Sequence, residues 1–273
     1  AAPTAAGQTW IVAMGADVQG LTKTNHVAER FAASVGRMFS VPAANIRINR
    51  NVTKAPFLDT IRWLAGHAGP TDRVFVVFSG HGFTMTDDNG DEADGLDEIF
   101  VTYDVEGVAA PMRSMMVSDD EFAALMRTVG ARDVVTVLDT CHSGGLHKSV
   151  RQTPTGAKAK SFNVAVWDSS RAPAATKSMI RGALESQDLA DSIRGVVLAA
   201  AEETQVALEG PEGGVFTVAL LKSWADGSAR TLGQSFTLAR DTAYRQSRNQ
   251  QRPSMAGDAA ILDRITLAPT TTR

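Results

Sequence analysis

The chain has 273 residues, of which 44% are hydrophobic and 21% are charged. This composition is ordinary for a soluble globular protein, and the length is sufficient to bury a core without disulfides or metals. The formal net charge of -3 gives no electrostatic reason to expect nucleic acid or an anionic membrane as a partner. No apolar run approaches the roughly 18 residues of a membrane-spanning helix, so no span is expected.

Cys141 is the only cysteine of the chain. It cannot form an intrachain disulfide, and a zinc site built on cysteines is not expected. A lone cysteine is more often a small buried hydrophobe than a nucleophile, so its neighbours must decide its role. The chain starts with small residues and no methionine at 1–6, which fits either a cytoplasmic protein or one exported after signal-peptide removal.

The first elements in the chain alternate between strand and helix. Residues 9–14 (TWIVAM) predict a buried strand, because the run is short, apolar and contains β-branched residues. Helical periodicity follows at residues 25–39 and 60–67, and a second strand is predicted at residues 73–78 (RVFVVF). Neither strand alternates polar with apolar residues, which favours a parallel sheet covered on both faces.

The middle of the chain departs from this alternation. Residues 86–98 form a strongly acidic loop, and residues 99–103 (IFVTY) predict a small antiparallel strand. A helix is then predicted at residues 118–129. Its start is marked by Ser118 and Glu121, whose spacing is that of a capping box.

The alternation resumes in the second half. Strands are predicted at residues 133–138 and 195–200, and helices at residues 216–224 and 236–247. Between the two strands lies a long mixed segment, residues 146–192, and such a long connection in a compact domain is usually functional or mobile. The whole pattern predicts an α/β fold with helices on both faces of a mainly parallel sheet.

Two of the predicted strands end in glycine-flanked reactive side chains. The second is followed by SGHG at 79–82, and the third by DTCHSG at 139–144. Because parallel strands end at one edge of a sheet, we expect His81 and Cys141 to lie together there. The imidazole could take the thiol proton, and the backbone N–H groups of Gly82 and Cys141 could stabilise an oxyanion. The alternative is a core histidine and a core cysteine.

These two motifs, together, resemble those of metacaspases and their bacterial relatives, the orthocaspases. Further similar segments lie at residues 91–98, 199–209, 213–221 and 251–254. The resemblance implies one caspase-like domain, a three-layer α/β/α sandwich with a mainly parallel six-stranded sheet. Its expected parts are a large-subunit-like portion at 1–145, a linker at 146–192 and a small-subunit-like portion at 193–273, all within a single domain at 1–273.

The resemblance also implies a function. Members of this family are cysteine endopeptidases that cleave protein or peptide substrates after Arg or Lys through a thioester acyl-enzyme. Cys141 would be the nucleophile and His81 its proton partner. Many members cut themselves in the linker, and the basic residues of 146–192 fit either self-cleavage or a solvated loop. We expect a monomer. The alternatives are another peptidase of this fold group or a catalytically silent scaffold or binding module.

A pocket for a cationic side chain needs a carboxylate, because a buried unpaired charge is very costly. Asp139 lies two residues before Cys141 and should point to the same side of the strand. It matches the pocket aspartate of the family, and Ser79 matches a residue that lines the pocket. The alternative for Asp139 is a solvated strand-end carboxylate. The family's second pocket aspartate follows an asparagine, but here Asn25 is followed by His26, which leaves the Arg-versus-Lys preference open.

A calcium site is the remaining expectation. Asp97, Asp119 and Asp120 correspond to ligands of calcium-dependent metacaspases, whereas a fourth ligand position falls near Lys148, which cannot bind a cation. Three of four ligands imply either a weak calcium site or none, so no cofactor is required. The alternative for Asp119 and Asp120 is that they are N-terminal helix charges, favoured by the helix dipole.

Overall fold

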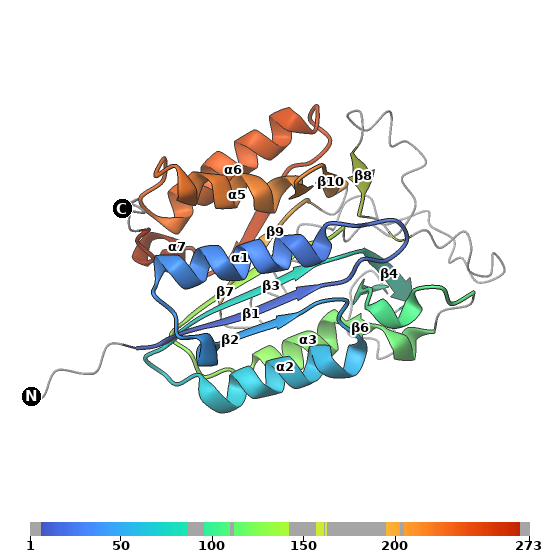
Figure 1. Ribbon diagram of the computed structural model, residues 1–273, viewed down its shortest axis with the longest axis horizontal. Coiled ribbons are helices and arrows are strands. Elements are labelled where there is room, and N and C mark those ends of the chain that lie inside the picture. The colour runs from blue at the N-terminus through green and yellow to red at the C-terminus, as the bar shows by residue number, and fades with distance from the viewer. Residues whose placement is uncertain are drawn as a thin grey trace, which may run out of the picture.

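A six-stranded sheet forms the centre of the protein. The computed structural model describes residues 7–86, 96–109, 112–141, 157–160, 162, 195–202 and 205–267. The strand order is β12-β9-β7-β3-β1-β2, and only β12 runs antiparallel to its neighbour (Figure 1). The strands are β1 Thr9–Gly15, β2 Ile46–Asn49, β3 Arg73–Ser79, β7 Asp133–Asp139, β9 Val196–Ala199 and β12 Ser254–Gly257. The predicted mainly parallel sheet is confirmed.

Helices cover both faces of this sheet. On one face lie α1 Thr24–Met38, α5 Val215–Ala225 and α6 Leu232–Gln246, and on the other lie α2 Lys54–His67 and α3 Asp119–Met126 (Figure 1). A short helix, α7 Ala260–Arg264, follows β12. Three 3-10 turns are also present among the described residues: η1 Ala43–Asn45, η2 Tyr103–Val105 and η3 Arg113–Met115.

The two-sided burial explains why the strands lack polar alternation. In β1, Trp10, Val12 and Met14 pack into the core on the side of α2 and α3. Ile11 and Ala13 point the other way and pack into the core beneath α1 and α5. Successive side chains of a strand point to opposite faces, so a strand between two helix layers must be apolar throughout.

The helix starts agree only in part with the sequence-based expectations. Ser118 and Glu121 form the predicted capping box at the start of α3, with reciprocal side-chain-to-backbone hydrogen bonds. The predicted start of α2 at residue 60 is wrong, because the helix begins at Lys54. Thr53 is extended and gives no side-chain cap, while Phe57 in the first turn is fully buried in the core. Burial of this aromatic ring stabilises a first turn in which Thr53, a favoured N-cap residue type, makes no cap hydrogen bond.

Two small antiparallel sheets lie beside the central one. The first has the order β4-β5-β6, with β4 Gly82–Thr86, β5 Leu96–Phe100 and β6 Val117–Ser118. The second has the order β11-β10-β8, with β8 Lys158–Ala159, β10 Leu208–Gly210 and β11 Gly213–Gly214. The strand predicted at 99–103 has the wrong bounds, since pairing with β4 fixes β5 three residues earlier.

Most of the predicted linker at 146–192 and most of the acidic loop at 86–98 lie outside the described residues. The described part of the linker is residues 157–160 and 162. Among the described residues, no helix combines the length and apolarity needed to cross a membrane.

Candidate active site

The two glycine-flanked motifs meet at one edge of the central sheet. Strands β3 and β7 are parallel neighbours, and Ser79 at the end of one lies opposite Asp139 at the end of the other. His81 and Cys141 each follow two residues later, so they leave the same edge. The segments are in direct contact: a Cβ atom on Gly82 would lie 2.0 Å from the carbonyl oxygen of Cys141. Only a glycine permits this close approach.

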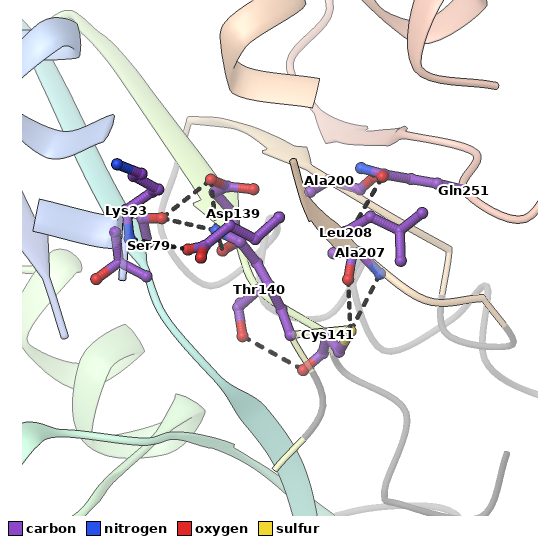
Figure 2. Close-up of polar contacts among 12 residues, drawn as sticks. Lys23, Ser79, Asp139, Thr140, Cys141, Ala200, Ala207, Leu208 and Gln251 are labelled. Carbon is purple, nitrogen blue, oxygen red and sulfur yellow. Dashed lines mark hydrogen bonds and ion pairs between the residues drawn. The ribbon is translucent and has the colours of Figure 1, made fainter. Parts of the chain in front are cut away.

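Cys141 is completely buried, and its sulfur faces the backbone of Ala207 (Figure 2). The Sγ atom accepts a hydrogen bond from the Ala207 N–H at 3.1 Å and lies 3.5 Å from the Ala207 carbonyl oxygen, to which the thiol donates. Burial raises the pKa of the Cys141 thiol to about 12. In this conformation the sulfur is therefore a protonated thiol at neutral pH, in a position that excludes water.

His81 is also buried, with 3% of its surface exposed. Burial lowers the pKa of the His81 imidazole to about 4, and the nearby ammonium of Lys160 acts in the same direction. The ring is therefore neutral at pH 7 and able to accept a proton. Among the described residues, neither ring nitrogen has a partner at normal hydrogen-bond geometry, so the ring is not held by the thiol in this conformation.

Asp139 forms a buried ion pair with the side chain of Lys160. The Lys160 Nζ lies 2.7 Å from the Asp139 Oδ2 and 2.7 Å from the Ser79 Oγ, and both charged side chains are fully buried. Ser79 in turn donates to the Asp139 Oδ2 at 3.0 Å. Gly214 leaves room for this carboxylate, since a Cβ there would lie 1.9 Å from the Oδ2. The solvated-carboxylate alternative for Asp139 does not agree with this geometry.

The backbone of Lys160 is held on both sides. Its N–H donates to the Ala207 carbonyl oxygen at 2.9 Å, and its carbonyl oxygen accepts from the Gly82 N–H at 3.2 Å. The preceding residues form β8, which pairs antiparallel with β10. Residues 158–160 thus add a strand to the protein in the way that many peptide ligands add to a sheet edge. The Lys160 carbonyl oxygen therefore accepts a hydrogen bond from the Gly82 N–H, which was predicted to be an oxyanion donor.

Three residues of this arrangement were not singled out by sequence reasoning. Lys160 was counted only among the basic residues of the linker, and its docking depends on a distant pairing with β10. Ala207 contributes only backbone groups, so no side-chain pattern could have revealed it. Gly214 carries the one available signal, a Gly-Gly pair before a helical pattern.

Asn25, which precedes the position of the family's second pocket aspartate, has a structural role here. The Asn25 side chain donates to the Asp17 Oδ2 at 2.8 Å and to the Asn51 Oδ1 at 2.7 Å, which ties the start of α1 to the loops after β1 and β2. His26 beside it is exposed. Asp139 is therefore the carboxylate that pairs with Lys160 among the described residues.

The three candidate calcium ligands are placed differently. Asp97 is buried and forms an ion pair with the guanidinium of Arg113. Asp119 is the first residue of α3, and burial, with help from the neighbouring Asp120, raises the pKa of its carboxyl to about 7. Within the described ranges, no three acidic, histidine or cysteine side chains are grouped to hold a metal ion. A guanidinium at Asp97 does not fit a divalent cation at the same carboxylate, so the calcium site stays a prediction.

Comparisons with known proteins agree with this architecture. Residues 17–260 match the family model described as a caspase domain. Over about 94 residues, one third of this chain, the sequence is 35% identical to Metacaspase-1 of Schizosaccharomyces pombe and 36% identical to Metacaspase-1 of Kluyveromyces lactis. Each match spans only about a fifth of the relative, 21% and 20% respectively.

Solved structures show the same fold over nearly the whole chain. A protein of Geobacter sulfurreducens superposes with a TM-score of 0.64 at 24% identity, covering 93% of this chain and 96% of that one. Caspase-1 of Spodoptera frugiperda superposes with a TM-score of 0.57 at 9% identity, covering 98% and 92%. The chain therefore belongs to the caspase-domain family of cysteine peptidases and is close to the metacaspases.

Proposed function

We propose that this chain is a cysteine endopeptidase that cleaves peptide bonds after Lys or Arg. Cys141 is the nucleophile, His81 accepts and returns the proton, and Asp139 recognises the basic side chain. One observation carries the proposal. The side chain of Lys160, a residue of the chain itself, pairs with Asp139, and the Lys160 carbonyl oxygen accepts from the Gly82 N–H. This is the pose in which a peptide substrate would present its scissile bond beside Cys141.

The reaction follows from these positions. His81, neutral because of its burial, takes the thiol proton, and the thiolate attacks the carbonyl carbon of the residue in the pocket. The N–H groups of Gly82 and Cys141 stabilise the resulting oxyanion. The protonated His81 then donates its proton to the leaving amine, which leaves a thioester on Cys141. Water activated by His81 hydrolyses the thioester and releases the acid.

The burial of Cys141 and His81, with Lys160 docked beside Asp139, supports a resting form of the enzyme. Burial raises the pKa of Cys141 to about 12 and lowers that of His81 to about 4, so moving the proton from thiol to imidazole is strongly uphill in this conformation. Much of this gap comes from burial, so entry of water or movement of the sulfur away from Ala207 lowers it. The thiolate is then formed together with the attack on the carbonyl carbon.

The charge of the pocket supports the basic preference. An aspartate side chain in place of the Lys160 ammonium would bring a second buried carboxylate against Asp139, which is strongly unfavourable. An arginine should also fit, because the Asp139 Oδ1 has no hydrogen-bond partner among the described residues. A guanidinium can donate to both oxygens of one carboxylate. The second oxygen thus offers arginine a bond that lysine does not make here.

The same pose supports self-processing. The Lys160 carbonyl group takes the place expected for the carbonyl group of a scissile bond, so we infer that the chain cuts itself after Lys160. The large portion would then end at residue 160, inside the linker expected at 146–192.

The proposal is tested with three chromogenic peptides that differ only in ending with Arg, Lys or Asp. We expect hydrolysis of the first two and none of the third, and no hydrolysis by the Cys141→Ala variant. Asp139→Asn should lose activity on the basic peptides, whereas His26→Asn, a change of an exposed side chain, serves as the matched control. Preference for the Asp peptide would refute the role of Asp139. Absence of self-cleavage together with absence of hydrolysis of all three peptides would favour a silent scaffold.

A further inference from the structure

Beyond the Asp139 ion pair, a second side chain of the same segment is buried, on the other side of the proposed scissile bond. Phe162 lies two residues after Lys160 and has 2% of its surface exposed. Its ring centroid is 5.4 Å from that of Phe83 and 6.1 Å from that of His81. The ring joins the core cluster on the α2 and α3 side of the sheet.

Gly82 fixes the register of this aromatic ring relative to the bond. Its N–H donates to the Lys160 carbonyl oxygen at 3.2 Å, and its own carbonyl oxygen accepts from the Phe162 N–H at 3.4 Å. One residue therefore holds the backbone on both sides of the bond between residues 160 and 161. A substrate bound through the same two hydrogen bonds would place its second residue after the cut where Phe162 lies.

The rings around Phe162 select for chemistry as well as position. Phe83 is fully buried and apolar, and the His81 ring is neutral because of its burial. Phe83 and Phe162 lie at an interplanar angle of 36°, and His81 and Phe162 at 64°, both common arrangements of packed rings. A charged side chain would lose its hydration there, whereas a small one would leave a void. A large apolar ring also covers His81 and keeps water from the imidazole.

We propose that Phe83 and His81 form a subsite for a large apolar side chain, preferably aromatic, at the second position after the cleaved bond. The inference rests on the proposed function. It extends the substrate class from peptides with Lys or Arg to those in which an aromatic residue follows two positions later. Phe83 acts as a specificity-determining residue, and Phe162 is the internal occupant of its site.

The test uses quenched fluorescent peptides of the sequence 155–164, with Lys158 replaced by Gln so that one basic residue remains. The second residue after the bond is Phe, Leu, Ala or Asp. The enzyme is the whole 273-residue protein, used after it has cleaved itself. Burial of a phenylalanine side chain predicts a kcat/KM about 10- to 100-fold higher for the Phe peptide than for the Ala peptide. The Leu peptide should lie between them and the Asp peptide below both.

Two variants add readouts in the chain itself. Phe83→Ala should bring the Phe-to-Ala ratio of kcat/KM close to one, with folding checked by circular dichroism. Phe162→Ala should slow self-cleavage after Lys160 at least tenfold, whereas Phe162→Leu should retain most of it. Equal kcat/KM for the Phe and Ala peptides, with both cut after lysine, would overturn the subsite and leave the proposed function intact. If the chain cuts neither itself nor any peptide, the proposed function fails, and the subsite with it.

Discussion

Replacing Lys160 by methionine removes the buried ammonium while keeping the length of the side chain. The Asp139 carboxylate, fully buried, would then lose its cation. Removing one partner of a buried ion pair costs about 3–5 kcal/mol of stability. Residues 157–160 can leave the pocket and let water reach Asp139, so the cost appears as loss of the docked state. A loss of about 3 kcal/mol lowers its population more than 100-fold.

Self-cleavage after position 160 should therefore slow at least 100-fold in Lys160→Met. In Lys160→Arg it should stay within about tenfold of the wild-type rate, because Asp139 accepts a guanidinium. Lys158→Met is the matched control: its ammonium is exposed and donates to the Gly20 carbonyl oxygen, outside the pocket. The assay follows fragment appearance by gel and assigns the cut bond by intact mass. A Lys160→Met chain that cuts the same bond at the wild-type rate would refute the pocket assignment.

Three further predictions concern the buried groups. Because burial lowers the pKa of His81 from 6.5 to about 4, the unfolded state binds more protons between these values, and stability falls as the pH falls through that window. Between pH 7 and pH 5, the Cys141→Ala protein should lose about 2 kcal/mol more of its free energy of unfolding than the Cys141→Ala/His81→Gln protein, as measured by urea unfolding. Equal losses would contradict the burial of His81. Iodoacetamide should label Cys141 at least tenfold faster in Lys160→Ala than in wild type that has not been cleaved, measured by mass spectrometry, whereas equal rates would mean that the docked segment does not shield the thiol. Since Arg113 pairs with Asp97, EDTA should leave the rate of peptide hydrolysis unchanged. If EDTA lowers the rate and added calcium recovers it, the predicted calcium site would be supported.

The sequence predicted the architecture where local pattern and burial agree. The runs that became β1, β3 and β7 are mainly apolar and lack polar alternation because helices cover both faces, and this is visible without a structure. The start of α2 was missed because its first turn holds a single large apolar residue, Phe57, which is too little to show helical periodicity.

The candidate site, too, could be predicted only in part. His81 and Cys141 could be expected at one edge because each follows a parallel strand, and the pairing of β3 with β7 brings their segments together. The docking of Lys160 could not be predicted. It depends on β8 pairing with β10, which lies far along the chain, and on backbone groups of Ala207 that no side-chain pattern reports.

The most direct test of the central claim is a cleavage profile of the self-cleaved protein on a peptide library with every residue varied before the bond. The account predicts cuts after Lys and Arg alone, all of them lost in Cys141→Ala. Cuts after acidic or apolar residues that depend on Cys141 would contradict the reading of Asp139 as the carboxylate that selects the substrate.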